Sequence, residues 1–160
     1  MSVYLSVAPP DGFTRWGEAD WDRWLREHPW ESAERVCSRG DWAIFLFQIR
    51  QHADQGRKLI EPLVEALVNE RPLTSRDAED FRLGLETARK ELGAKPASAM
   101  KNGNGHFAGS EDLDAMIAAA TSRKGKEPSV ADVWHEVFDQ LEKVLAGALA
   151  QKRGIYFGNV

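Results

Sequence analysis

The fold is decided by residues 129–151, which read SVADVWHEVFDQLEKVLAGALAQ. Apolar residues recur in this stretch at steps of three and four, which is the period of one face of an α-helix. They are Val130, Val133, Trp134, Val137, Phe138, Leu141, Val144, Leu145, Ala148 and Leu149. At 1.5 Å per residue, a helix of this length spans about 34 Å and can cross a small domain. We therefore expect one long amphipathic helix around which the rest of the chain packs.

Two more helices are expected between residues 41 and 71. The apolar run 42–47 follows Asp41, a common helix cap, and a polar tail leads to Gly56, which predicts a helix of about four turns. A buried strand is the alternative for this run. Proline fits best in the first turn of a helix, so Pro62 predicts that the next helix begins near Glu61. The residues that this second helix should bury are Leu63, Val64, Leu67 and Val68.

A further helix follows directly. Thr74 and Asp77 have the spacing of a capping box, in which two side chains satisfy free backbone N–H groups at a helix start. Gly93 and Pro96 favour the end of this helix, since glycine is common just after helices and proline cannot continue one. Between these signals the expected buried face contains Ala78, Phe81, Leu85, Ala88 and Leu92.

Residues 93–109 are rich in glycine and asparagine, a composition that predicts a long flexible loop. Ser110 then predicts the start of a helix, because it precedes Glu111, Asp112 and Asp114, and acidic side chains stabilise the positive end of the helix dipole. The expected buried face of that helix contains Leu113, Met116, Ile117 and Ala120.

The two ends of the chain have strand character. Residues 3–7 alternate between apolar and polar types, and residues 155–157 are strand formers after Gly154, so the two segments could pair. Between them, Asp20 predicts the cap of a short helix that ends before Pro29, and residues 30–37 predict another helical turn or two.

The expected fold class is therefore mainly α. We expect one compact helical domain over residues 1–160, with five to seven helices around the long C-terminal helix and short terminal strands that could pair. The chain has six tryptophans and a hydrophobic fraction of 42%, which is ordinary for a globular protein.

Composition also restricts the class of protein. The formal net charge of −4 disfavours a broad nucleic-acid surface, which needs a basic face. The longest apolar run is far shorter than the roughly 20 residues that span a bilayer, and residues 1–10 lack the pattern of a signal peptide. One cysteine, Cys37, excludes an internal disulfide. We therefore expect a soluble, cytoplasmic protein without membrane contacts and without a broad nucleic-acid surface. A local basic patch on one face remains the nucleic-acid alternative, formed by Arg123, Lys124, Lys126, Lys152 and Arg153.

Tryptophans are concentrated near the N-terminus, at positions 16, 21, 24, 30 and 42. One interpretation places these rings in the core, with arginine side chains over them. The other makes them an anchoring surface, since tryptophan and arginine are the residues that most often dominate protein interfaces. A small core cannot hide all five, so Trp16 and Trp30, with Arg15 and Arg26 nearby, are the candidate binding residues. In the 93–109 loop, His106 and Phe107 are further candidates.

Catalytic and metal-binding patterns are weak. Asp132, His135 and Asp139 share helical spacing, but His135 lies well away from the apolar stripe, which favours a solvated face. Residues 103–106 lack the Gly-Lys-Ser/Thr ending of a phosphate loop. Cys37 has arginines near it in sequence, but a single cysteine is more often a small buried hydrophobe. We therefore expect no metal, no cofactor and no catalytic residue.

The leading functional hypothesis is a non-catalytic protein that binds another macromolecule, most simply a protein. An inhibitor, an immunity protein or an adaptor would fit, acting through an acidic surface that contains tryptophan. The alternative is an enzyme or small-ligand-binding protein whose site lies between the tryptophan-rich N-terminal region and the 93–109 loop. The sequence is compatible with a homo-oligomer in either case.

Overall fold

The computed structural model describes residues 1–28, 33–101 and 110–158 and is mainly helical, as predicted. Its helices and strands are β1 (Ser2–Val7), η1 (Asp11–Arg15), α1 (Glu18–Glu27), β2 (Glu34–Ser38), α2 (Arg39–His52), α3 (Asp54–Val68), α4 (Ser75–Gly93), η3 (Ala97–Lys101), α5 (Ser110–Lys124), α6 (Val130–Val133), α7 (His135–Ala150) and β3 (Ile155–Gly158), where η denotes a 3-10 helix. Within the described residues, no helix is both long and apolar enough to cross a membrane.

The strands form one antiparallel sheet in the order β2-β1-β3. The predicted pairing of the chain ends is confirmed, since Leu5 of β1 lies opposite Phe157 of β3. The helical turns predicted for residues 30–37 are wrong from Glu34 onward, because this segment pairs with the other edge of β1. That pairing buries Val36 and Cys37 and supplies partners for the backbone, which a helix of one or two turns could not do as well.

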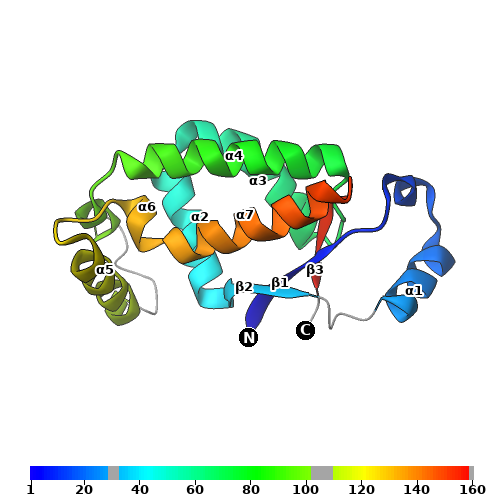
Figure 1. Ribbon diagram of the computed structural model, residues 1–160, viewed down its shortest axis with the longest axis horizontal. Helices are drawn as coiled ribbons and strands as arrows, with labels where there is room; N and C mark the ends of the chain where they lie inside the picture. The colour runs from blue at the N-terminus through cyan, green and yellow to red at the C-terminus, as the bar shows by residue number, and fades with distance from the viewer. Residues whose placement is uncertain (29–32, 102–109, 159–160) are drawn as a thin grey trace.

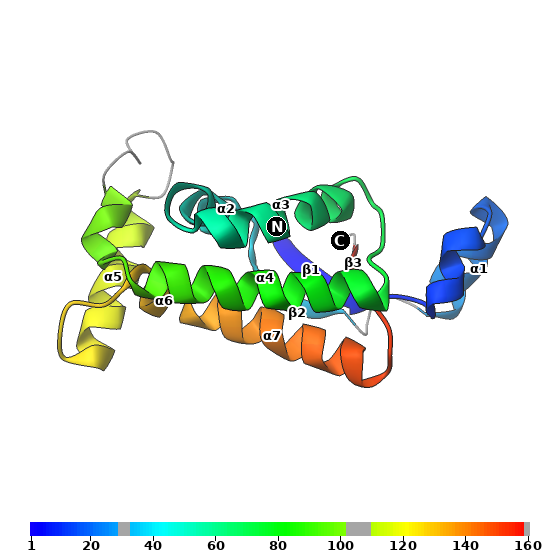
Figure 2. The ribbon, with the colours of Figure 1, turned by 90° about the horizontal axis from the view of Figure 1, so that it is seen from above.

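Helices α4 and α7 run side by side, with α7 between α4 and the sheet (Figure 1). Helix α3 packs along another face of α4, and α2 leads from the end of β2 to α3 (Figure 2). The centre of this arrangement is apolar. Its largest fully buried side chains include Phe45 of α2, Phe81 of α4, and Trp134 and Phe138 of the C-terminal segment.

The predicted single helix over residues 129–151 is interrupted. It consists of α6 and α7, and Trp134 between them has φ −97° and ψ 15°, outside the helical range. The apolar face is nevertheless buried along both pieces, with Val137 and Leu141 in the core. At this bend the centroid of the Trp134 ring lies 5.7 Å from that of Phe45. Packing of the two rings thus compensates for the loss of regular helix geometry at Trp134.

Three predicted helix starts are wrong, whereas that of α4 is confirmed. Helix α2 begins at Arg39, and its cap is not Asp41 but Ser38, whose hydroxyl accepts a hydrogen bond from the Asp41 N–H. Helix α3 begins at Asp54 and carries Pro62 in its interior, on the exposed side, where solvent can bond the carbonyl that proline leaves without a donor. Helix α1 begins after Gly17, and Asp20 accepts a hydrogen bond from the Gly17 N–H instead of being the cap itself. Helix α4 has the predicted capping box, with Asp77 N donating to Thr74 Oγ1.

Of the predicted 93–109 loop, the structure describes residues 93–101, and these contain the short 3-10 helix η3. Ala97 and Met100 of η3 are buried, so this part of the loop contributes to the core. Helix α5 begins at Ser110 as predicted. On its predicted face, Leu113 and Ala120 are buried, whereas Met116 and Ile117 are half-buried against the core.

Candidate functional site

Three of the six predicted binding residues lie together at one end of the molecule. Trp16 is half-buried, and Arg15 and Arg26 are exposed. Trp30, His106 and Phe107 lie outside the described residues. The three placed residues belong to the segment formed by η1 and α1, residues 11–27, which we call the tryptophan arm.

The tryptophan arm extends from one end of the molecule (Figures 1 and 2). None of the residues of α1, all of which are described, is buried. The rings instead pack on one another: Trp21 makes edge contacts with Phe13 and Trp16 at centroid distances of 5.6 and 5.5 Å, and Trp16 lies 6.0 Å from Trp24. The arm is thus a small aromatic cluster separate from the main core, with Leu25 exposed beside it at 48%.

Ser75 and Arg153 of the body hold the arm in place. Asp11 accepts hydrogen bonds from the backbone N–H of Ser75, at 2.9 Å, and from its hydroxyl. The Arg153 guanidinium lies over the Trp24 ring at 5.1 Å, and its Nε donates to the Ala8 carbonyl at 2.6 Å. These contacts tie the arm to the start of α4 and to the turn before β3. The aromatic face is therefore held at a defined position rather than swinging freely.

The other end of the molecule is formed by α5, α6 and η3 (Figures 1 and 2). The alternative hypothesis needs a site between the tryptophan-rich region and the 93–109 loop. In the described residues, the tryptophan arm and residues 93–101 lie at opposite ends of the long axis. The described parts of these two segments therefore do not form a shared site.

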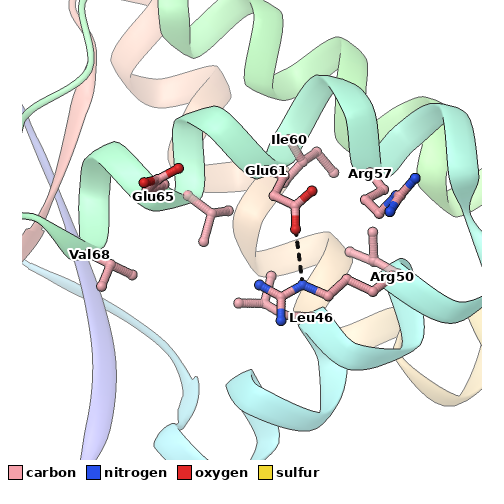
Figure 3. Close-up of a pocket in the computed structure, with 9 residues that line it drawn as sticks. Leu46, Arg50, Arg57, Ile60, Glu61, Glu65 and Val68 are labelled. Atoms are coloured by element: carbon pink, nitrogen blue, oxygen red, sulfur yellow. Dashed lines mark hydrogen bonds and ion pairs between the residues drawn. The ribbon is translucent and has the colours of Figure 1, made fainter.

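A groove that the sequence did not predict lies between α2 and α3 (Figure 3). The two helices meet at Ala53, and side chains from both line a hollow of about 340 Å³. Its walls contain Leu46, Ile49, Arg50, Arg57, Ile60, Glu61, Val64, Glu65 and Val68, and we call it the α2–α3 groove. Its volume falls in the range of small-molecule sites, and its lining is mostly apolar.

Val68 at the far end of the groove was predicted to be buried, and that prediction is wrong, since the residue is 60% exposed. Val68 also lines a second hollow of about 380 Å³, which contains Trp42, Phe157 and Arg39. The two hollows are therefore adjacent. Helical periodicity placed Val68 on the inward face of α3, but among the residues that the structure describes no element covers the last turn of that helix on this side.

The rims of the groove carry opposite charges. Glu61 of α3 points across to α2 and accepts a hydrogen bond from Arg50 Nε at 3.2 Å (Figure 3). Glu65 lies one turn further along the α3 rim. Near the helix junction, Arg57 donates to Asp54, and Lys58 and Arg57 together hold the pKa of Asp54 below its usual value. Arg57 and Lys58 share the single Asp54 carboxylate, and Arg50 on the opposite rim is paired with Glu61.

Nucleophilic chemistry at Cys37 is disfavoured. Burial and, to a smaller extent, the nearby Asp41 carboxylate raise the pKa of this thiol to about 12, although Arg35 acts in the opposite direction. Since the thiolate is the reactive form, Cys37 is inert at neutral pH. The prediction of a small buried hydrophobe matches its position on β2.

The described histidines do not form an acid–base or metal site. His135 Nδ1 accepts a hydrogen bond from Arg123 Nη2 at 3.1 Å. The His28 ring stacks on the Trp24 ring, with 3.5 Å between the ring centroids. Burial, together with the charge of Lys95, lowers the pKa of His52 despite a hydrogen bond with the backbone of Ala99. Across residues 1–28, 33–101 and 110–158, no three His, Cys, Asp or Glu side chains come close enough to hold a metal ion.

Comparisons with protein-family models, with curated proteins and with solved structures found no match to this chain. Any functional conclusion therefore rests on the residues of the chain itself.

Proposed function

We propose that this protein is a non-catalytic protein-binding module of the inhibitor, immunity-protein or adaptor type. It binds its partner through the tryptophan arm, and it acts in the cytoplasm. One observation carries the proposal: α1 is amphipathic, yet none of its described residues is buried, and its apolar face contributes nothing to the main core.

The composition of the arm favours binding to protein. Tryptophan combines a large apolar surface with a hydrogen-bond donor, and exposed clusters of it commonly mark protein interfaces. Trp21, Trp24 and Leu25 lie on one face of α1 and are all at least partly exposed. A partner that covers this face would remove apolar surface from water without any change in the fold of the arm.

Charge around this face favours a basic partner. Acidic residues of α1 outnumber basic ones, with Glu18, Asp20, Asp22 and Glu27 against Arg23 and Arg26. Arg23 is paired with Asp20 at 2.6 Å, which leaves the remaining carboxylates to set the local potential. The net charge of the whole chain, −4, has the same sign. Opposite charge on a partner would speed association and help to orient it.

Affinity capture with matched variants tests the proposal. The tagged protein and a Trp21→Ala, Leu25→Ala variant are each incubated with lysate of the cells that make the protein, and bound proteins are quantified by mass spectrometry. We expect at least one protein to be recovered with the wild type and reduced at least about tenfold with the variant, the size of a hot-spot loss. The matched control is Leu59→Ala, Leu83→Ala, which removes two exposed leucines from the helical body.

The control should recover the same partner as the wild type, and circular dichroism should show that both variants fold. Equal recovery of every bound protein by the wild type and the arm variant would overturn the proposal. So would a wild type that enriches no protein over the tag alone.

A further inference from the structure

The α2–α3 groove is apolar along its floor and has rims of opposite charge, and we propose that it is a docking site for an amphipathic α-helix of a protein partner. The acidic flank of that helix faces Arg50 and Arg39 on α2. Its basic flank faces Glu61 and Glu65 on α3. The groove is separate from the tryptophan arm, so this is a second binding surface and does not depend on the first.

The shape of the groove suits a helix. Its lining on α3 runs from Arg57 to Val68, about 18 Å of helix, and the second hollow continues from Val68. A helix of about four turns fits this length, and an apolar stripe at steps of three and four would reach both hollows. Val68 lies where the two hollows meet and is 60% exposed, so the most open apolar side chain of the α2–α3 groove is at the end that adjoins the second hollow.

The apolar surface of the groove that a partner could cover is concentrated at Leu46 and Val68. Ile49, Ile60 and Val64 form the floor and are themselves buried, whereas Leu46 on α2 is half-buried and Val68 on α3 is exposed. An exposed apolar hollow bordered by charged side chains is typical of a protein or ligand interface. In the described part of the chain, no segment lies over this floor.

The charged side chains on the two rims favour one kind of helix in the groove over others. Arg50 on α2 and Glu61 and Glu65 on α3 are all exposed, and the Arg50–Glu61 pair lies across the groove with both partners about half exposed. Arg39 extends the positive rim into the second hollow. A helix with carboxylates on one flank and ammonium groups on the other would place opposite charges along both rims, as paired flanking charges do in coiled coils.

A second copy of this chain fits poorly as the occupant. Its only exposed amphipathic helix among the described residues is α1, whose apolar face has acidic residues on both sides. At 100° per residue, Glu18 and Asp22 fall on one flank, and Asp20 and Glu27 fall on the other. Docking of α1 would therefore place carboxylates against Glu61 and Glu65, and repulsion of this kind disfavours the wrong partner.

Binding of designed peptides to the full-length protein tests the inference. Three helix-stapled peptides of about 18 residues share one leucine stripe and differ only in their flanks. The first has Glu on one flank and Lys on the other, the second has Glu on both, and the third has Lys on both. We expect the mixed peptide to bind the wild type at least about tenfold tighter than either of the others, by fluorescence anisotropy.

Two groove variants sharpen the test. Glu61→Lys, Glu65→Lys makes both rims basic and should shift the preference to the peptide with Glu on both flanks. Glu127→Lys, Glu136→Lys changes the net charge equally at two exposed sites outside the groove and should keep the preference for the mixed peptide. Val68→Asp should weaken binding of the mixed peptide at least about tenfold, whereas Leu83→Asp should not.

Several results would overturn the inference. They are equal affinity of the three peptides for the wild type, no binding of the mixed peptide below about 1 mM, and unchanged binding by Val68→Asp. A concentration-dependent dimer that Val68→Asp dissociates in sedimentation experiments would also overturn it, because the groove would then bind a second copy of the chain.

Discussion

Gly56 of α3 lies directly against Ala88 of α4, so closely that a Cβ atom on Gly56 would be 2.5 Å from the Ala88 Cβ and 2.6 Å from its Cα. A similar approach occurs at Gly84, where an added Cβ would be 2.8 Å from Ile60. The two helices thus pack through small residues on both sides. This close packing sets the position of α3, and with it one wall of the α2–α3 groove.

The contact predicts that Gly56→Ala destabilises the protein. The new methyl group would overlap the backbone of α4, which cannot move aside as a flexible side chain can, and overpacking of this kind costs about 1–3 kcal/mol. Higher helix propensity of alanine recovers up to about 1 kcal/mol of that loss. We expect a lower free energy of unfolding in urea, by about 2 kcal/mol at most.

Gly147→Ala is the matched control for this substitution. Gly147 is exposed in α7, and an added Cβ would meet no atom within 4 Å. Only the propensity gain remains, so the variant should be more stable than the wild type by about 0.5–1 kcal/mol. If both glycine variants change the free energy of unfolding in the same direction, that result would contradict close packing of α3 against α4 at Gly56.

Glu91 of α4 supplies the cap that α3 lacks in its own sequence. Its carboxylate accepts hydrogen bonds from the backbone N–H groups of Gln55, at 3.2 Å, and Gly56, at 2.7 Å. Glu91→Ala should therefore lower the free energy of unfolding by about 1 kcal/mol, the usual cost of losing a cap. Glu86→Ala on the exposed side of the same helix should change it by less than about 0.5 kcal/mol. Comparable losses in the two variants would contradict the capping role.

Cys37 predicts a specific loss of stability at high pH. Its folded-state pKa of about 12 lies above its ordinary value of 9.0, so the folded protein favours the protonated thiol. The resulting stability is fully present below pH 9 and is lost as the pH rises from 9 toward 12. Relative to Cys37→Ala, the wild type should lose up to about 1.4 kcal/mol per pH unit in this range. Parallel pH profiles for the two proteins, measured by urea unfolding, would show that the thiol is not buried in this way.

Arg153 connects the tryptophan arm to the body, which predicts a local effect when it is removed. Arg153→Ala loses both the contact with the Trp24 ring and the bond to the Ala8 carbonyl. We expect amide hydrogen exchange in α1 to accelerate by about tenfold, with little change in α4, because α1 has few other contacts. The exposed Arg76→Ala is the control and should leave exchange in α1 unchanged. Equal exchange in α1 across all three proteins would mean that Arg153 does not hold the arm.

Much of the helical fold was predictable from local signals. Period and capping identified α4 because Thr74, Asp77 and the apolar stripe lie within one continuous segment. The terminal strands were predictable because their alternation is visible in short stretches. Both kinds of signal act between residues close in sequence.

The errors have long-range causes. The start of α3 depends on Glu91, which is 35 residues beyond Gly56. Strand β2 exists because Val3 lies opposite Cys37, and the break at Trp134 follows its packing on Phe45. Neither the periodicity of a segment nor its capping residues contain this information.

The candidate surfaces were predictable to different degrees. The tryptophan-rich sequence predicted that part of the arm is an exposed surface, since a small core could not bury every ring. The α2–α3 groove could not be predicted, because the spacing of Leu46, Val64 and Val68 is that of ordinary buried helix faces. Only the arrangement of α2 and α3 in space determines that these residues line an open groove.

Photo-crosslinking from Leu25 tests the central claim, that the tryptophan arm binds a protein partner, most directly. A benzophenone amino acid replaces Leu25 in one experiment and Leu83, which is 45% exposed on α4, in the matched control. After irradiation of the cells that make the protein, we expect one discrete crosslinked protein from position 25 and none from position 83. No adduct from position 25, or the same adducts from both positions, would contradict the account.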